Sequence, residues 1–207
     1  MTIKAIIFDF DGTLADTKKI WISSIKQALD KHRLFFDIET IEKKLGPKLQ
    51  MTFQNLGVTD AHGKIRHEVH EQIMKKINKV KPCPYIKETL KYFKKTKKIK
   101  VILLTNTIRR IIIALLKKIR ILNFFDEVYC ADDFDTKDQL IVSLAKKNNI
   151  KTKEIIYVGD KVHDISIGKK AKCAYYVVLE CGFDKNILKK RREKFILKDI
   201  RQLKKIV

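Results

Sequence analysis

Two carboxylates separated by a single residue, Asp9 and Asp11, follow an apolar run at residues 3–8 near the start of the chain. Alternate side chains of an extended segment point to the same side, so both carboxylates can face one cleft. Two acidic groups this close repel each other unless a positive charge lies between them, and a divalent metal ion commonly supplies it. The pair therefore indicates a metal-dependent site; the alternative is a strand that ends in an acidic turn.

The two residues after this pair are suited to binding an anion. Gly12 lets the backbone approach a bound phosphate closely because it carries no side chain. Thr13 offers both a hydroxyl and a backbone amide to the same anion. The motif at residues 9–13 therefore predicts phosphate chemistry, with Gly12 and Thr13 as substrate-binding residues.

Two later apolar runs also end in polar residues. They are residues 100–104, followed by Thr105 and Asn106, and residues 155–158, followed by Gly159 and Asp160, with Asp164 further on. Short β-branched runs bounded by turn residues are typical of buried parallel strands, and ligands bind beyond the carboxyl ends of such strands. A cation, Lys137, precedes a helical stretch between the two runs. We expect these groups to converge on one edge of a sheet.

Taken together, these residues resemble the haloacid dehalogenase-like (HAD) superfamily, and more narrowly its phosphoglycolate phosphatase-like branch. The four motifs of the superfamily match, in order, residues 9–13, Thr105 with Asn106, Lys137, and residues 159–164. The resemblance extends over essentially the whole chain. One departure is that Asp138 follows Lys137 where the family commonly has a proline, which leaves the pose of Lys137 open.

The resemblance implies a role for each motif. Asp9 would attack phosphorus and form an aspartyl-phosphate, and Asp11 would protonate the leaving oxygen and then activate water. Thr105 and Lys137 would hold the phosphoryl oxygens, and Asn106 would join them in binding substrate. The implied ligands of Mg²⁺ are Asp9, Asp11 through its main-chain carbonyl, and Asp160, with Asp164 orienting Lys137 or a metal-bound water.

The placement of these motifs depends on an alternation of strands and helices. Strands are predicted at residues 3–8, 100–104, 127–131, 155–158 and 175–179, and helices at residues 18–32, 39–45, 49–56, 65–80, 85–97, 108–122, 139–148 and 165–172. This alternation predicts an α/β fold, a doubly wound parallel sheet with helices on both faces.

Several predicted helices lie between the first two strands with no strand among them, which indicates a separate helical unit. In the resembled family this position holds a helical cap that closes over the active site. We therefore expect a Rossmann-like HAD core from residues 1–15 and 82–207, with a small all-helical cap domain at residues 16–81. Trp21 is expected in the interior of that cap.

The cap is also where the resemblance places substrate specificity. Residues 46–48 resemble the cap loop that reaches over the active site, and Lys48 could meet a carboxylate or a second phosphate of the substrate. The expected substrate is a small phosphorylated metabolite. Phosphoglycolate, a sugar phosphate, a nucleotide and pyrophosphate all remain open.

The charge of the chain needs a separate interpretation. It has 46 Lys and Arg against 24 Asp and Glu, a formal net charge of +22. Such a field attracts anions and can hold nucleic acid non-specifically. Lysines are spread through every helical segment of an equally isoleucine-rich chain, which favours solvated faces and a compositional bias. The densest cluster, residues 189–192, is the best candidate for a basic patch, and nucleic acid is a possible but not favoured partner.

The location of the protein and the state of its cysteines are predicted from sequence patterns that are absent. No run approaches 18 apolar residues and no long apolar core precedes the acidic pair, so we expect neither secretion nor a membrane span, and a cytoplasmic location. The four cysteines, Cys83, Cys130, Cys173 and Cys181, form no CxxC pair and are expected to be buried free thiols rather than disulfides or zinc ligands. The oligomeric state is left open.

Other reactions and roles compete with a phosphatase. Dehalogenases and phosphonate hydrolases of the resembled superfamily lack the second carboxylate and are disfavoured. A phosphomutase of the same fold stays an alternative, although phosphomutases commonly carry valine at the position of Thr13, which favours hydrolysis. A basic nucleic-acid-binding protein that kept a phosphatase scaffold, or a phosphatase of polynucleotide ends, is the alternative from another class. The intact set of Asp9, Asp11, Lys137 and Asp160 argues against an inactive scaffold.

Overall fold

The computed structural model describes residues 2–191 and 193–207, and its centre is a six-stranded sheet. The strand order is β5-β4-β1-β6-β7-β8, and every neighbouring pair is parallel. The strands are β1 (Ala5–Phe8), β4 (Lys100–Leu104), β5 (Glu127–Tyr129), β6 (Ile155–Gly159), β7 (Ala174–Val178) and β8 (Ile196–Leu197). The predicted parallel sheet is confirmed.

Strand β1 lies between β4 and β6, so its carboxyl end is the middle of one edge of the sheet. Phe8 is in register with Leu103 of β4 on one side and with Val158 of β6 on the other. The loops that follow these three strands therefore begin side by side, and they carry the acidic pair, the hydroxyl motif and the second acidic motif. The register confirms that these motifs converge on one edge.

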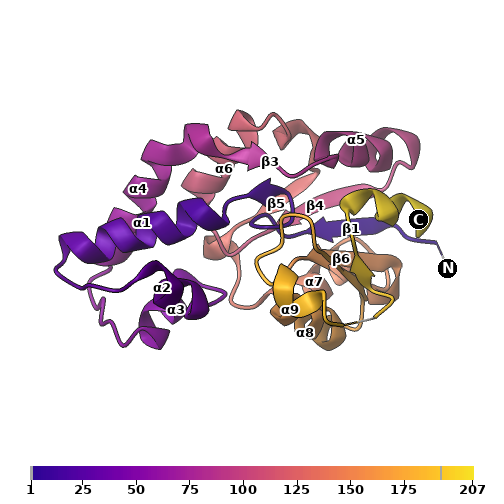
Figure 1. The fold of residues 1–207 in the computed structure, drawn as a ribbon. Coiled ribbons are helices and arrows are strands. Elements are labelled where there is room, and N and C mark those ends of the chain that lie inside the picture. The colour runs from indigo at the N-terminus through magenta and orange to yellow at the C-terminus, as the bar shows by residue number, and fades with distance from the viewer. Residues whose placement is uncertain (1, 192) are drawn as a thin grey trace.

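Helices cover both faces of the sheet (Figure 1). On one face, Ile6 and Phe8 share a buried cluster with residues of α5 (Ile86–Lys91), α6 (Arg109–Lys118) and the 3₁₀ turn Ile200–Lys205. On the other, the alternate strand residues Ala5 and Ile7 share a cluster with α7 (Lys137–Lys147) and α8 (Val162–Ala171). Continuous apolar strands arise because every position of these strands is covered on one face or the other.

Four helices gather at one end of the molecule, between β1 and the return of the chain to the sheet (Figure 1). They are α1 (Lys18–Lys31), α2 (Ile38–Lys43), α3 (Leu49–Asn55) and α4 (Lys64–Lys76). A short antiparallel ladder joins β2 (Ala15–Asp16) to β3 (Lys81–Pro82) where the chain leaves and re-enters the core. The predicted domain boundaries fall in this ladder, and the division into core and cap stays a prediction.

Several element ends differ from the sequence prediction for local reasons. Helix α8 begins at Val162, three residues earlier than predicted, because the Asp164 carboxylate accepts the backbone amide of Lys161 and caps the helix. The predicted helix at residues 85–97 is α5 followed by a π turn at Tyr92–Thr96. The remaining short elements are α9 (Lys185–Leu188) and the 3₁₀ turns Ile77–Lys79, Leu122–Phe124, Ala131–Asp133 and Thr152–Glu154.

The cysteine prediction was wrong for one pair. Cys83 and Cys181 are joined in a disulfide across 98 residues of sequence, with their Cα atoms 6.1 Å apart. Cys130 and Cys173 are buried free thiols, as expected. A pairing over such a distance depends on tertiary placement, which the spacing of cysteines does not reveal.

The sequence analysis made two predictions about contacts with other molecules, one on a membrane span and one on a basic patch. No helix among the described residues has the length and apolarity needed to cross a bilayer. The predicted basic cluster extends from the end of α9, and its residue 192 lies outside the described residues.

Candidate active site

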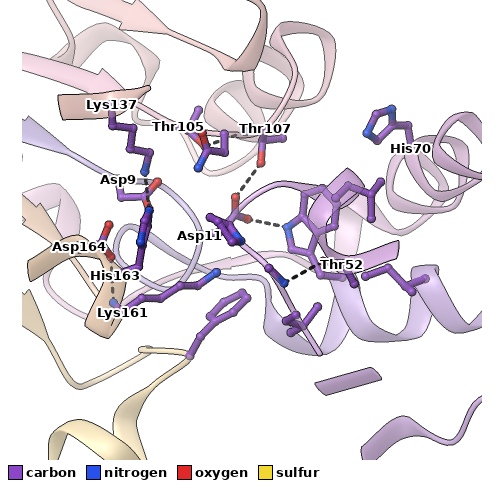
Figure 2. A pocket seen from close by; sticks show the side chains of 18 residues that line it. Asp9, Asp11, Thr52, His70, Thr105, Thr107, Lys137, Lys161, His163 and Asp164 are labelled. Carbon is purple, nitrogen blue, oxygen red and sulfur yellow. Dashed lines mark hydrogen bonds and ion pairs between the residues drawn. The ribbon is translucent and has the colours of Figure 1, made fainter. Parts of the chain in front are cut away.

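Asp9 lies directly after β1, and its carboxylate meets the ammonium group of Lys137 at 2.8 Å (Figure 2). The backbone amide of Phe10 donates to the same carboxylate at 2.7 Å. Lys137 is the first residue of α7 and is only 4% exposed, so its charge is directed inward. The aspartate that follows it in place of a proline does not prevent this contact.

A chain of hydrogen bonds continues from Lys137 to the second acidic motif. The ammonium group donates to the hydroxyl of Tyr157 at 3.1 Å, and that hydroxyl donates to Asp164 at 2.7 Å. Burial and the nearby carboxylate of Asp164 raise the pKa of Tyr157 well above its usual value, so the hydroxyl keeps its proton. Sequence reasoning assigned Tyr157 to a buried strand only, although a buried tyrosine usually needs a hydrogen-bond partner.

Three buried carboxylates form a cluster at the same edge. Asp9, Asp160 and Asp164 each place an oxygen within 4.8 Å of the others. Burial raises the pKa of Asp9, although Lys137 opposes the shift, and burial raises the pKa of Asp160 well above its usual value. Hard divalent cations take carboxylate oxygens as ligands and offset the repulsion between neighbouring carboxylates, so the donor set fits Mg²⁺.

Two glycines make room for this cluster. Gly12 has a φ of +76°, and a Cβ built on it would lie 2.3 Å from a carboxylate oxygen of Asp160. A Cβ on Gly159 would lie 2.2 Å from Cγ of Asp164. Both distances are too short for real atoms, so each glycine lets a carboxylate lie directly against the backbone. Gly12 therefore has a role in placing Asp160 in addition to its predicted role at the phosphate.

The Asp11 side chain points away from the cluster, towards the helical segment (Figure 2). One carboxylate oxygen accepts from the hydroxyl of Thr17 at 2.6 Å and the indole N–H of Trp21 at 2.7 Å. The other accepts from the hydroxyl of Thr107 at 2.7 Å. The sequence did not indicate these three donors. Trp21, expected in the interior of the cap, packs against the buried cluster that includes Ile22 and Leu29, and it also lines the pocket.

Of the remaining predicted residues, some line the pocket and others do not. Thr105 is buried at the pocket wall and accepts the backbone amide of Thr107 at 3.1 Å, and Asn106 lines the same wall. Thr13 is buried beside Asp160. The ammonium group of Lys48 instead donates to the backbone carbonyl of Asp135 at 2.9 Å, and Lys48 does not line the pocket among the described residues.

The pocket has an inner and an outer part. The inner pocket, of about 80 Å³, is lined by Asp9, Asp11 and Lys137, while an adjoining cavity of about 580 Å³ lies between α2, the Phe183 loop and α9. The residues that line both are Leu45, Gly46, Pro47, Lys161, His163 and Phe183. Gly46 and Pro47 come from the predicted cap loop, so this loop does reach the pocket even though Lys48 does not.

Three further ionisable residues that line the pocket, Lys161, His163 and His70, were not predicted as site residues. Burial acts to lower the pKa of Lys161, but the carboxylates of Asp160 and Asp9 outweigh burial and raise that pKa. Burial and the charge of Arg110 lower the pKa of His70, on α4, to about 4. At neutral pH the pocket therefore contains a charged lysine and a neutral histidine.

Comparison with known proteins finds a matching family model, related sequences and a shared fold. The family model described as haloacid dehalogenase-like hydrolase matches residues 6–178. A relative named pyrophosphatase PpaX from Oceanobacillus iheyensis is 28% identical over 210 residues, covering 100% of this chain and 98% of the relative. Its counterpart from Bacillus velezensis is 31% identical over 179 residues, covering 82% and 80%. The crystal structure of a hydrolase from Pseudomonas syringae has the same fold, with a TM-score of 0.84, 20% identity and 99% coverage of both chains.

Proposed function

Because this chain belongs to the haloacid dehalogenase-like hydrolase family, and its relatives of similar length include phosphatases, we propose that it is a Mg²⁺-dependent phosphatase of small phosphorylated metabolites. The observation that carries the proposal is the contact of a buried carboxylate, Asp9, with Lys137 beside the cluster formed with Asp160 and Asp164. A nucleophile, a cation for the transferred group and a set of metal ligands thus meet at one point.

In the proposed reaction, Asp9 is the nucleophile. One of its carboxylate oxygens bonds to phosphorus while the bond from phosphorus to the leaving oxygen breaks, which yields an aspartyl-phosphate. Lys137, 2.8 Å from that carboxylate, stabilises the negative charge of the transferred group. Thr105 and the backbone at Gly12 and Thr13 bind the phosphoryl oxygens.

Asp11 is proposed as the acid and then the base. It gives a proton to the leaving oxygen and later takes one from the water that hydrolyses the aspartyl-phosphate, so the cycle returns both aspartates to their starting state. Its carboxylate is held beside the pocket by hydrogen bonds from Thr17, Trp21 and Thr107, so these donors position it for proton transfer. Trp21 belongs to α1, so the position of the Asp11 carboxylate depends on the position of the helical segment.

Asp9, Asp160 and the main-chain carbonyl of Asp11 are the proposed ligands of Mg²⁺, with Asp164 beside them. When bound, the cation would offset the repulsion between an anionic nucleophile and an anionic substrate. The amide of Phe183 holds Asp160 at 2.6 Å, and the amides of Asp160 and Lys161 hold Asp164 at 3.0 and 2.9 Å. These bonds fix the carboxylates before a cation arrives.

A phosphate-release screen tests the proposal. The purified protein is assayed with Mg²⁺ on pyrophosphate, phosphoglycolate, sugar phosphates, nucleotides and an aryl phosphate. We expect release from at least one small phosphorylated compound, loss of release in excess EDTA and recovery on adding Mg²⁺. Ca²⁺ should support little activity because it relaxes the octahedral geometry that Mg²⁺ requires. Full activity in excess EDTA would contradict the proposal.

A further inference from the structure

The lysines that line the inner pocket and the outer cavity differ in their partners. Lys18 pairs with Glu42 at 2.5 Å, Lys43 with Glu39 at 2.6 Å and Lys137 with Asp9 at 2.8 Å. Lys161 forms no ion pair with any of residues 2–191 and 193–207. It is therefore the cavity-lining lysine whose ammonium group remains available to a ligand.

Lys161 is also held in a defined place. It follows Asp160 directly, and its backbone amide donates to Asp164 at 2.9 Å, so its main chain is fixed at the start of α8. Its ammonium group lies 4.5 Å from the ring centre of Phe183, on the wall shared by the inner pocket and the outer cavity (Figure 2). The charge therefore lies at the boundary between the site of phosphoryl transfer and the space beyond it.

A half-buried ammonium group that makes no ion pair within the described residues can bind an anion, because charge-assisted hydrogen bonds strengthen where water is partly excluded. If the scissile phosphate of a substrate occupies the inner pocket, the adjoining outer cavity is the space available to its leaving group. The part of the substrate that meets Lys161 is therefore the leaving group and not the transferred phosphoryl group.

We propose that Lys161 binds an anionic group on the leaving part of the substrate, so that the enzyme prefers phosphate compounds with a second anion close to the scissile bond. This inference rests on the proposed phosphatase function and narrows its substrate class. A second phosphate, as in pyrophosphate, and a carboxylate, as in phosphoglycolate, offer Lys161 the same chemistry. The sequence assigned this role to Lys48, whose ammonium group lies on the Asp135 carbonyl instead.

The test compares, for each enzyme variant, a substrate that carries a second anion with a substrate that lacks one. Phosphoglycolate is paired with 2-hydroxyethyl phosphate, which replaces its carboxylate with a neutral hydroxymethyl group, and pyrophosphate is paired with methyl phosphate. Each is assayed with wild type, Lys161→Met, which removes the charge, and Lys161→Arg, which keeps it. Lys169→Met is the matched control, because Lys169 is an exposed lysine of the same helix and its loss changes the net charge equally.

We expect Lys161→Met to lower kcat/KM about 10- to 100-fold for the preferred substrate with a second anionic group, mainly through KM, and less than about threefold for its partner without that group. Lys161→Arg should recover most of the lost kcat/KM. Lys169→Met should leave kcat/KM unchanged for both members of each substrate pair. Loss on pyrophosphate alone or on phosphoglycolate alone identifies which anion Lys161 binds. Equal losses on both members of a pair, or no loss on either, would overturn the inference.

A binding measurement keeps the inference testable apart from turnover. Calorimetry with Mg²⁺ compares methylenediphosphonate, which resists hydrolysis, with methylphosphonate, which lacks the second anion. We expect Lys161→Met to weaken binding of the first about 10- to 100-fold and of the second little. If neither compound loses affinity, Lys161 has no such role, whereas failure of the phosphatase proposal appears separately, as no phosphate release by wild type from any substrate.

Discussion

Asp11 shows how a catalytic candidate depends on neighbours that the sequence does not reveal. Its two carboxylate oxygens accept three hydrogen bonds, and one donor, Trp21, belongs to a helix of the segment between β1 and β3. The motif predicted the aspartate itself because two carboxylates at alternate positions share a face of an extended chain. Its donors come from sequence positions 6, 10 and 96 residues away, and no local pattern marks them.

We predict that Trp21→Phe lowers kcat about tenfold with a smaller change in KM. The variant keeps the aromatic bulk but removes the N–H that positions Asp11, so it affects proton transfer more than substrate binding. Steady-state kinetics on the best substrate of the screen measure both constants, and circular dichroism checks the fold. A rise in KM with unchanged kcat would assign Trp21 to substrate binding instead.

The second residue-scale prediction uses a matched pair of glycines. Gly12 and Gly57 both have positive φ, +76° and +70°, but a Cβ meets Asp160 at Gly12 and nothing within 4 Å at Gly57. Both alanine variants carry backbone strain of about 1 kcal/mol, and only Gly12→Ala displaces a carboxylate of the cluster. We expect Gly12→Ala to lose at least about 100-fold in kcat/KM and Gly57→Ala to stay within about twofold. Similar activities of the two variants would show that a Cβ at position 12 does not displace Asp160.

At the scale of elements, the central strands were predictable and the shortest ones were not. Strands β1, β4 and β6 are apolar, β-branched runs bounded by turn residues, and this pattern determines a buried parallel strand almost by itself. Strands β2, β3 and β8 have two residues each, too few for any periodicity. Their pairing depends on where the rest of the fold places them, and this explains why the ladder at the base of the helical segment appears only in the structure.

The disulfide links two elements beside the active site. Cys83 follows β3, its backbone amide donates to the Leu14 carbonyl, and Cys181 lies two residues before Phe183 in the loop that holds Asp160. Closing a loop of about 100 residues restricts the unfolded chain, and such bonds typically contribute about 2–4 kcal/mol to stability.

We predict that Cys181→Ser lowers the free energy of unfolding by about 2–4 kcal/mol under non-reducing conditions. Urea unfolding with and without reductant measures the effect, and the reduced wild type is the control because it keeps every side chain. Reductant should lower wild type towards the variant and leave the variant unchanged. Equal stability of oxidised wild type and variant would show that the bond is absent in solution or contributes nothing.

At the scale of the whole molecule, local ion pairs offset part of the positive charge. Ion pairs such as Lys4 with Glu154, Lys31 with Glu68 and Lys204 with Glu88 lie at the surface of different elements. Exposed pairs of this kind contribute little stability each, and salt screens them. The excess of lysine produces a general electrostatic field that attracts anions. Within the described chain, Lys161 differs from the other lysines by its position at the pocket and not by its contribution to the net charge.

Stability should also depend on pH through His70. Its pKa is about 4 in the folded chain against 6.5 as the usual value, because burial and Arg110 disfavour the charged imidazole. Between pH 6.5 and 4 the unfolded chain takes up a proton that the folded chain does not, so the free energy of unfolding falls as the pH falls. Allowing for partial exposure, we expect a loss on the order of 1 kcal/mol by pH 5.

Urea unfolding at pH 7 and pH 5 tests this prediction in wild type, His70→Asn and His62→Asn. The His70 variant should lose less stability than wild type between the two pH values, whereas the exposed His62 serves as the control and should behave as wild type does. Identical pH dependence of all three proteins would rule out His70 as the group responsible.

The measurement that most directly tests the central claim is phosphate release by Asp9→Asn with Mg²⁺. The amide keeps the shape of the side chain but cannot act as the nucleophile, so we predict a loss of at least about 1000-fold with the fold intact by circular dichroism. Asp135→Asn, an exposed aspartate outside the pocket, is the control and should retain wild-type activity. If Asp9→Asn keeps more than about a tenth of wild-type activity, Asp9 is not the nucleophile and the proposed mechanism is wrong.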